Sequence, residues 1–574
     1  MFLLRLLLLI SFLTFQAYST DDTVSQNYDE FIKFHWKGAL TSNSIILKVF
    51  PNTKELKKHN YNVFLAYYNK THDQSVDFLR FKALTFSSGE YPVAEIKLEN
   101  LEPSTEYFYS FIFSSTSDIS SPDLQVIPNP EFSFKTFQIA LTPANFTFGL
   151  ASCAPTGSNS SVFLDLKEKH LDFFMHMGDF HYDDNDEDNV EKFYQTYHKV
   201  FSSPNQKAFF QQTPITYVWD DHDFGPNDAI GTSPSKPAAT KAYKDFVPYY
   251  PLKNYLPSDD SQVFPGKAPV GVITGDEYKV YNHTSPFGIF RSFIVGRCLF
   301  IMMDLRSFLE VEPDDILGAE QKDWLENQIK YAGLNEGIKM VFVTSSFSWI
   351  HNGGPTFEEI VWSSHRNTQK LIADQIQTYI NKTNKKIMFL CGDAHMLAFD
   401  DGRNNRFGGF PVVQAASLDK KPNCKGGPYS HGTFPGKGQY GIIEVTDAND
   451  TICVKINLMR GNISMIAYDT CHPELYPSTG SAKCHPTWGD FSMMMGVVCV
   501  SISVLVWCFV RRRKQQVKSG NGKQKHGLNI RYGYGYENMK EDGKGSEEIE
   551  EDNSGFRQNS KIEMTNKKKS HKGD

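Results

Sequence analysis

Side chains that can bind metal ions are concentrated in four short clusters, which are widely separated along the 574-residue chain. Each cluster offers hard or borderline metal ligands, namely thiol, phenol, imidazole, amide or carboxylate groups. In each case the ligands follow a run of residues that is typical of a strand. The clusters are Ala151-Ser-Cys153, Gly178-Asp-Phe-His-Tyr182, Trp219-Asp-Asp-His-Asp-Phe-Gly-Pro-Asn-Asp228 and Cys391-Gly-Asp-Ala-His395.

Each cluster taken alone has an ordinary structural explanation. A buried cysteine such as Cys153 usually behaves as a small apolar side chain. A Gly-Asp pair is often only a turn, and a lone histidine is more often hydrogen-bonded than bound to metal. Four such strand ends in one sheet are hard to explain in this way. The four aspartates of residues 220–228, together with Asp393, would also repel one another without a cation between them. We therefore expect the four clusters to converge on a shared metal centre.

From residue 145 onward, predicted strands alternate with predicted helices, which is the pattern of an α/β fold. The predicted strands are Phe146–Leu150, Phe173–Met177, Ile215–Val218, Arg297–Met303, Ile338–Thr344 and Lys386–Cys391. The predicted helices are Val162–His170, Leu317–Ala332 and Ser364–Asn381. Sites in such sheets lie beyond the carboxyl ends of the strands, where the four clusters stand. We therefore predict a catalytic domain over residues 145–465.

Residues 30–138 show short alternating strands separated by turns, so we predict a β-sandwich in front of the catalytic domain. The strands are residues 44–50, 61–67 and 93–98, with a last strand at residues 134–137. The segment Leu101-Glu-Pro-Ser-Thr-Glu-Tyr-Phe-Tyr resembles a turn and strand of a fibronectin type III sandwich. In such a domain Tyr107 would anchor a corner through its hydroxyl. No chemical cluster falls in this segment, and we expect its role to be structural.

Both ends of the chain carry membrane signals. Residues 1–19 combine one arginine with a short apolar run, and we interpret them as a cleaved signal peptide; a retained anchor is the alternative. Residues 491–510 contain no charge and match the thickness of a bilayer core, and Arg511, Arg512, Arg513 and Lys514 follow at once. We therefore predict a transmembrane helix and a single-pass type I protein. Its catalytic domain would be extracellular or lumenal, at the plasma membrane or a secretory or endosomal membrane.

The segments that flank this helix are also predicted from composition. Residues 466–490 would form a juxtamembrane segment, and residues 511–574 a disordered cytosolic tail with 16 Lys/Arg against 10 Asp/Glu. Tyr536-Glu-Asn-Met matches a weak endocytic sorting pattern, which makes cytosolic sorting machinery a candidate partner. The net charge of the whole chain is −7, which argues against a nucleic-acid binder, because such proteins usually carry a basic domain.

Glycosylation motifs and cysteines support this topology. Seven Asn-X-Ser/Thr motifs precede residue 491 and the tail has none, as expected of a glycoprotein ectodomain. They begin at Asn69, Asn145, Asn159, Asn282, Asn381, Asn449 and Asn462. Seven cysteines also precede residue 491, so at least one thiol stays unpaired in an oxidising compartment. Pairs of Cys471 with Cys484 and of Cys424 with Cys453 are conceivable, but the sequence alone does not decide between pairings.

In this order the four clusters resemble those of PhoD-type alkaline phosphatases, a branch of the calcineurin-like metallophosphoesterase superfamily. The resemblance extends over roughly residues 30–460, and its most discriminating part is the run Trp219–His222 with Asn227. It implies a four-layer metallophosphoesterase sandwich for the catalytic domain, preceded by the β-sandwich. Ser152-Cys153-Ala154 replaces the usual Asp-X-His opening, which favours this branch over purple acid phosphatases. Further matches are Asp304-Leu-Arg306, Leu317-Gly-Ala-Glu-Gln321 and Trp324-Leu325.

The resemblance implies a ferric ion (Fe3+) and one or two calcium ions (Ca2+). The metal ligands would be Cys153, Asp179, Tyr182, Asn227, Asp393 and His395. Thiolate, phenolate and imidazole would bind iron, Asp179 would bridge iron to calcium, and Asn227 and Asp393 would hold calcium through oxygen. This division follows the preferences of the two metals. Coordination would also keep Cys153 out of disulfides.

The implied reaction is hydrolysis of phosphate monoesters or diesters, with metal ions polarising the phosphoryl group and supplying the attacking hydroxide. His222, with Asp221 nearby, would stabilise the phosphoryl group or protonate the leaving oxygen; an orienting role is the alternative. Asp223 is a candidate for orientation or substrate binding. Arg306 is a candidate for neutralising phosphate, although we favour a structural ion pair with an acid.

A second class of function stays open, namely an inactive metallophosphatase-like binding protein of the cell surface. Loss of several ligands would favour it, and none is missing. Within the enzyme hypothesis, cleavage of phospholipid diesters, for example a phospholipase D activity, fits an anchor that holds the site near a lipid surface. The segment Trp362-Ser-Ser-His-Arg366 matches the family only loosely, which concerns the substrate pocket rather than the metal ligands.

Overall fold

The computed structural model describes residues 28–70, 76–117, 132–250, 288–310, 315–351, 362–383, 385–448 and 450–478. The predictions on the signal peptide at residues 1–19, the membrane helix at 491–510 and the tail at 511–574 lie outside these residues. Among the helices of the described ranges, none combines the length and the apolar character needed to cross a bilayer.

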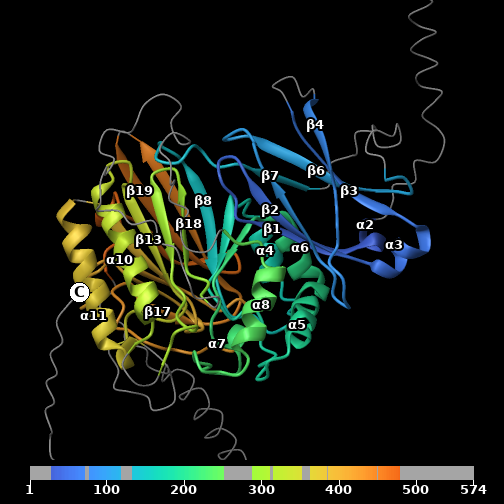
Figure 1. The fold of residues 1–574 in the computed structure, drawn as a ribbon. Coiled ribbons are helices and arrows are strands. Elements are labelled where there is room, and N and C mark those ends of the chain that lie inside the picture. Colours follow the sequence, from blue (N-terminus) through green and yellow to red (C-terminus); the bar gives the residue numbers. More distant parts are fainter. Residues whose placement is uncertain are drawn as a thin grey trace, which may run out of the picture. The chain divides into compact units, whose positions relative to one another are not determined.

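A nine-stranded sheet forms the first half of the core in which the predicted catalytic domain lies (Figure 1). Its strands in spatial order are β20 (Ile463–Asp469), β19 (Thr451–Arg460), β18 (Gln439–Ala448), β8 (Phe146–Ala151), β9 (Phe173–His176), β10 (Ile215–Tyr217), β1 (Ile32–Gly38), β2 (Ile45–Pro51) and β5 (Ala94–Leu98). β8, β9 and β10 are parallel neighbours, so their carboxyl ends share one edge. They are almost entirely buried, as expected of parallel strands that are covered on both faces.

A seven-stranded sheet forms the second half. Its strands in spatial order are β11 (Arg291–Val295), β12 (Cys298–Met302), β13 (Met340–Ser345), β14 (Lys386–Cys391), β16 (Val412–Ala415), β15 (Met396–Asp400) and β17 (Thr433–Pro435). Alternate side chains of β12 enter different cores: Phe300 packs against the nine-stranded sheet, while Leu299 and Ile301 face the other side. Contact of Phe300 with Phe148 and Phe173, at 5.4 and 5.6 Å between ring centroids, joins the two sheets.

Helices cover the outer faces of both sheets. On the seven-stranded side, Trp324, Leu325 and Ile329 of α10 (Gly318–Leu334) are buried, and α11 (Arg366–Tyr379) packs beside that helix. On the other side, Phe209 of α6 (Pro204–Gln212) contacts Phe174 at 5.1 Å. Further helices are α4 (Val162–Lys167), α5 (Val190–Ser202), α7 (Asp221–Phe224) and α8 (Lys236–Phe246), with short 3-10 turns at Trp362–Ser364, Asn381–Thr383 and Pro473–Leu475. This core therefore has the order helix, sheet, sheet, helix, as the predicted four-layer sandwich requires.

The N-terminal segment is not confined to a sheet of its own. Four of its strands form a separate sheet, in the order β4 (Val76–Ala83), β3 (Asn62–Lys70), β6 (Glu106–Ser114) and β7 (Phe132–Lys135). The other three, β1, β2 and β5, continue the nine-stranded sheet, because Gly38 of β1 pairs with Ile215 of β10. Short helices α2 (Tyr28–Phe31) and α3 (Thr53–His59) accompany them. The fibronectin type III assignment is therefore not confirmed, although the Tyr107 hydroxyl does accept the Glu102 amide at 2.8 Å, as predicted.

The disulfide of the last strands corrects both suggested cysteine pairs, because Cys453 is bonded to Cys471. β19 and β20 are antiparallel with Lys455 opposite Asp469, so residues 453 and 471 fall opposite each other at the end of the hairpin. Their Cα atoms lie 5.3 Å apart, within the usual range for a disulfide. Cys153, Cys298 and Cys391 are buried free thiols.

Candidate metal centre

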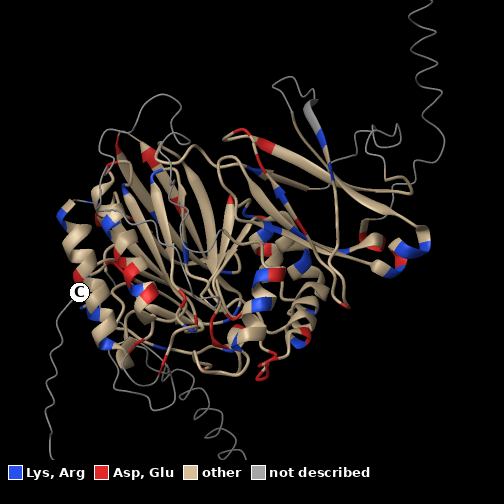
Figure 2. Ribbon diagram, viewed as in Figure 1, with Lys and Arg blue, Asp and Glu red and all other residues tan. Residues whose placement is uncertain are grey.

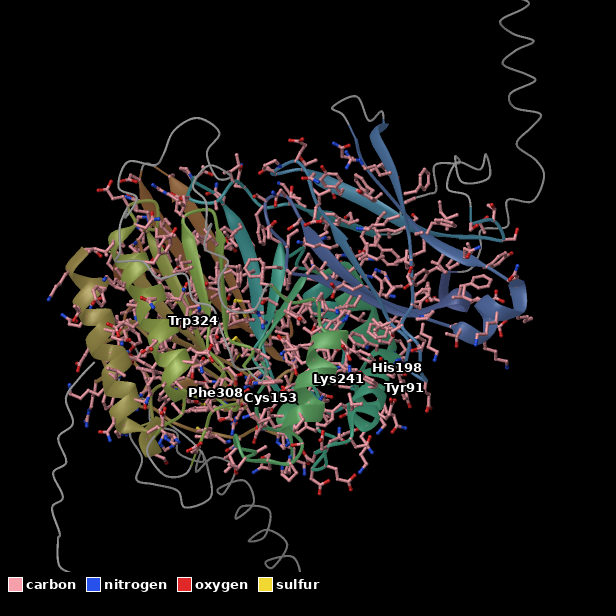
Figure 3. The ribbon with its side chains drawn as sticks, in the orientation of Figure 1. Tyr91, Cys153, His198, Lys241, Phe308 and Trp324 are labelled. Atoms are coloured by element: carbon pink, nitrogen blue, oxygen red, sulfur yellow. A yellow bond between two sulfur atoms is a disulfide. The ribbon has the colours of Figure 1, made fainter. Side chains whose placement is uncertain are left out.

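The four sequence clusters meet at one edge of the two sheets. Cys153 follows β8, Asp179 follows β9, Asp220 follows β10, and Asp393 and His395 follow β14 of the other sheet. Figure 3 labels Cys153 toward the end of the strands where α7 lies in Figure 1. Acidic segments colour the loops around α7 in Figure 2. Both sheets thus deliver their carboxyl-end loops to the same place, as expected for an α/β site.

The backbone at these loops is bent into an uncommon conformation. Cys153, Asp179, Asp393 and His395 have φ angles of 65°, 54°, 64° and 38°, which is the left-handed region that side chains rarely adopt. Such strain persists where the surrounding structure enforces it, and it is concentrated at functional sites. Gly178 has φ 97°, and a Cβ there would lie 2.5 Å from Cβ of Asp220. Glycine at this position therefore permits the turn that presents Asp179.

Four of the predicted ligands form a compact donor cluster. The Cys153 sulfur, a carboxylate oxygen of Asp179 and a ring nitrogen of His395 all lie within 4.8 Å of one another. The Tyr182 hydroxyl donates to Oδ2 of Asp179 at 2.5 Å and lies 3.4 Å from Nε2 of His395. The Cys153 thiol is free of any disulfide. The residues of strands far apart in sequence thus surround one point, as the shared metal centre requires.

The electrostatics of this cluster fit a cation. Burial, and then the neighbouring aspartates, raise the pKa of Asp179 and of the Cys153 thiol well above their ordinary values. Burial, and then Asp179 and Cys153, raise the pKa of the Tyr182 phenol well above its ordinary value. The other carboxylate oxygen of Asp179 is buried and has no hydrogen-bond partner among the described residues. Acidic groups that are driven toward their neutral forms, with an unsatisfied oxygen among them, match the ligand set of a bound metal ion.

A second donor group adjoins the first. A carboxylate oxygen of Asp179, one of Asp221 and a ring nitrogen of His222 lie within 4.8 Å of one another. Asn227 and Asp393, the predicted calcium ligands, line the same cavity of about 290 Å³. The cavity is lined by Asp179, Tyr182, Asp221, His222, Asn227, Asp228, Arg306, Asp393, His395, Lys420, Asn423 and Lys425. All predicted ligands therefore line the cavity except Cys153, which is fully buried and belongs to the donor cluster with Asp179 and His395.

His222 is held from outside the cavity. Its Nδ1 lies 2.5 Å from Oδ1 of Asp184, and its ring packs 4.0 Å from that of Tyr182. Because Nδ1 is engaged by Asp184, Nε2 is the nitrogen left to act within the cavity. Beside it, burial works to raise the pKa of Asp221, but Arg306 and His222 outweigh burial and hold that pKa below its usual range.

Two of the predicted substrate contacts have structural partners. Nε of Arg306 donates to Oδ1 of Asp220 at 2.6 Å, and both side chains are almost fully buried. This is the favoured ion pair of Arg306, although its side chain also lines the cavity. Asp223 does not line the cavity. Its carboxylate accepts hydrogen bonds from the backbone amides of Phe180 and Asp220, at 2.7 and 3.0 Å, so it positions the loops, which is the orienting role predicted as one alternative; a role in substrate binding stays a prediction.

The basic residues that line the cavity were not predicted from the sequence. Lys420, Asn423 and Lys425 come from one loop after β16, and Nζ of Lys425 donates to Oδ1 of Asp393 at 2.9 Å. Three lysines within residues 420–425 were the available signal, but nothing in the sequence placed this loop beside the other clusters. Trp362 of the loosely matching segment is buried in the second core, where its indole donates to Ser345 at 2.9 Å.

The chain is similar to a known protein family in sequence and to a solved structure in fold. The model of the family described as PhoD-like phosphatase matches residues 148–414. No curated protein matches the chain by sequence. A solved structure titled "Structure of PhoD" is 15% identical, with a TM-score of 0.52, over 79% of this chain and 90% of that chain. A purple acid phosphatase, PPD1 from seeds of yellow lupin (Lupinus luteus), is 11% identical with a TM-score of 0.45, over 80% of this chain and 78% of that chain.

Proposed function

We propose that phosphate-ester hydrolysis takes place in the cavity beside Cys153, Asp179, Tyr182 and His395. Residues 148–414 match the PhoD-like phosphatase family, and the chain is accordingly a metal-dependent phosphoester hydrolase. The observation that carries this proposal is the convergence of the sulfur, carboxylate and imidazole donors within 4.8 Å. The substrates are phosphate monoesters or diesters. Water is added across the ester bond, so the P–O bond to the leaving group breaks and an alcohol and a phosphate product are released.

Iron and calcium are the proposed metals. Cys153, Tyr182 and His395 would hold a ferric ion, because thiolate, phenolate and imidazole are ligands that suit a transition metal. Asp179 would bridge to calcium, which Asn227 and Asp393 would bind through oxygen. When bound, these ions would neutralise charge on the phosphoryl group and lower the pKa of a water molecule.

The chain's own residues would supply the remaining functions. His222 is the proposed proton donor to the leaving oxygen, because its Nδ1 contacts Asp184 and its other nitrogen is left for the cavity. Asp221 supports this end of the site, since its carboxylate accepts the Asp228 amide at 2.7 Å and is fixed in place. Arg306 would hold the Asp220 and Asp221 loops together through its ion pairs.

The direct test is purification of the full-length protein, followed by metal analysis, a visible spectrum and assays with an aryl phosphate and an aryl phosphodiester. We expect iron and calcium, a visible absorption band from thiolate or phenolate bound to ferric ion, and hydrolysis of at least one ester. Removal of the metals with a chelator should abolish hydrolysis, and re-addition should restore it. A colourless, metal-free protein that cleaves neither ester would instead support the binding-protein alternative.

Replacement of Cys153 tests whether this residue binds iron, and a control variant shows whether any iron loss comes only from a less stable fold. We expect Cys153→Ala to weaken iron binding by at least roughly 10- to 100-fold, because even partners that only orient a ligand contribute that much. The visible band should fall in proportion. Cys298→Ala is the matched control, since Cys298 is also a buried free thiol but lies within β12, away from the ligand clusters. Equal iron loss in both variants would contradict the assignment of Cys153.

We also propose that the protein is a type I membrane protein with this domain outside the cytosol. The proposal rests on the sequence of residues 491–514, and exposed side chains at Asn145, Asn159, Asn381 and Asn462 are compatible with glycosylation. In intact cells, N-glycosidase treatment should lower the apparent mass, and a tag after residue 574 should be accessible to antibody only after permeabilisation. Antibody access to that tag in intact cells would contradict this topology.

A further inference from the structure

One loop gives the cavity a basic wall whose role the metal centre does not explain. Lys420 and Lys425 line the cavity together with Asn423 and the acidic ligands. Lys425 is already engaged, because its ammonium donates to Asp393 at 2.9 Å. The third cation of the cavity, Arg306, is engaged by Asp220. Lys420 differs from both.

The Lys420 ammonium has no carboxylate partner among the described residues. Its Nζ lies 3.4 Å from the centroid of the Tyr182 ring, so it stands directly over a proposed metal ligand. Such a cation–π contact leaves the ammonium's remaining hydrogens free to donate. A lysine whose charge is not used by an acid, and which faces a phosphoesterase cavity, is suited to bind an anion.

The loop that carries Lys420 is held in place by backbone hydrogen bonds. The amides of Leu418 and Asp419 donate to the carbonyls of Ser152 and Cys153, at 2.9 and 3.1 Å. The Asn423 amide approaches the His395 carbonyl at 3.4 Å. Within the loop, the Ser417 hydroxyl donates to the Lys420 carbonyl at 2.9 Å. The loop is therefore anchored on the backbone of two proposed metal ligands, and the position of Lys420 is set relative to the metals.

This placement bears on the charge of the substrate. A phosphate monoester above neutral pH carries two negative charges on its phosphoryl group, whereas a diester carries one. The proposed metals would compensate the charge that is common to both. The Lys420 ammonium, already held beside the metals, would form a further ion pair with the second negative charge, which a monoester has and a diester lacks.

We propose that Lys420 is a substrate-binding residue that recognises the second negative charge of a phosphate monoester, and that it thereby sets the preference of the enzyme for monoesters over diesters. This inference rests on the proposed function of the cavity. It assigns Lys420 to substrate specificity rather than to metal binding.

The test compares full-length wild-type protein with Lys420→Met, which keeps the apolar stem over Tyr182 and removes the charge. We expect kcat/KM for an aryl phosphate monoester to fall roughly 10- to 100-fold, the value of a hydrogen bond to a charged group. For the matching aryl diester the fall should stay below about threefold. Lys420→Arg should recover most of the loss. Lys421→Met is the matched control, because Lys421 carries the same charge next in the chain but is exposed and outside the cavity.

Binding measured by calorimetry gives a readout that does not depend on turnover. Inorganic phosphate should bind Lys420→Met more weakly than wild type by a similar factor, while dimethyl phosphate, a single-charge probe, should be little affected. Equal losses on both esters, or a lower iron content in Lys420→Met, would overturn the proposal, because Lys420 would then act on chemistry or on Tyr182. Failure of the wild type to cleave either ester would instead refute the proposed function. The comparison of phosphate binding by wild type and Lys420→Met would still test whether Lys420 recognises the second charge.

Discussion

Asp179→Asn is expected to reduce hydrolysis of an aryl phosphate at least about 100-fold and to lower the content of both metals. Even partners that only orient a metal ligand contribute about 10- to 100-fold, and Asp179 is proposed to bind two ions directly. Asparagine has nearly the same shape, and it tolerates the left-handed φ of 54° at this position. The variant therefore removes one negative charge without disturbing the turn. Activity and metal content are the two measurements.

The matched control for this variant is Asp172→Asn. Asp172 precedes the same strand, β9, at the end opposite to Asp179, and it is also partly buried and hydrogen-bonded, accepting the Thr147 amide at 2.8 Å. Its replacement should leave metal content and kcat nearly unchanged. If Asp179→Asn retained metals and activity, or if both variants lost them equally, the proposed bridging role of Asp179 would be wrong.

Arg306→Met is expected to lower the free energy of unfolding by about 3–5 kcal/mol, the cost of removing one partner of a buried ion pair. The side chains of Arg306 and Asp220 are 3% and 1% exposed, and Ser346 also donates to Asp220 at 2.9 Å. Without the guanidinium, the Asp220 carboxylate would keep too few partners for a buried charge. Because Arg306 also reaches Asp221, at 3.7 Å, the loop around α7 should loosen and activity should fall as well. Urea unfolding of the purified full-length protein measures the effect on stability.

An ion pair with an exposed arginine provides the comparison. Arg403 pairs with Asp401 at 3.0 Å, but its side chain is 62% exposed. Arg403→Met should therefore change the unfolding free energy by only about 0–1 kcal/mol, because the Arg403 guanidinium is largely solvated in the folded protein and Asp401 keeps its hydrogen bond from the Ser430 hydroxyl. A similar small effect for Arg306→Met would show that Arg306 is not needed for the architecture, and its contribution to phosphate binding would then gain weight.

Much of the fold was predictable because its signals are local. The predicted strand at residues 386–391 coincides with β14, and the predicted helix at residues 317–332 covers most of α10. Alternation of apolar residues and turn chemistry depend on neighbours within a few positions, so a single sequence shows them. The metal-ligand clusters were found for the same reason, since each is a short run directly after a strand.

The remainder depended on contacts between distant segments. Both suggested disulfides were wrong, because the register of β19 and β20 decides which cysteines face each other. The joining of β1 to β10 depends on pairing across more than 170 residues, which no local pattern announces. Lys420 was not predicted as a site residue, because a lysine in a loop is ordinarily solvated. Only the position of its ammonium over the Tyr182 ring distinguishes it.

By itself, the sequence determined which residue types stand at the strand ends, and hence the chemistry of sulfur, phenol, imidazole and carboxylate ligands. Tertiary structure alone decided that Cys153, Asp179 and His395 come within 4.8 Å, that Asp223 supports the loops, and that Lys420 faces the cavity. The physical reason is that strand periodicity is set by neighbouring residues, whereas convergence is set by the packing of two sheets over a common core. Donors separated by more than 200 positions become neighbours only when that core is closed.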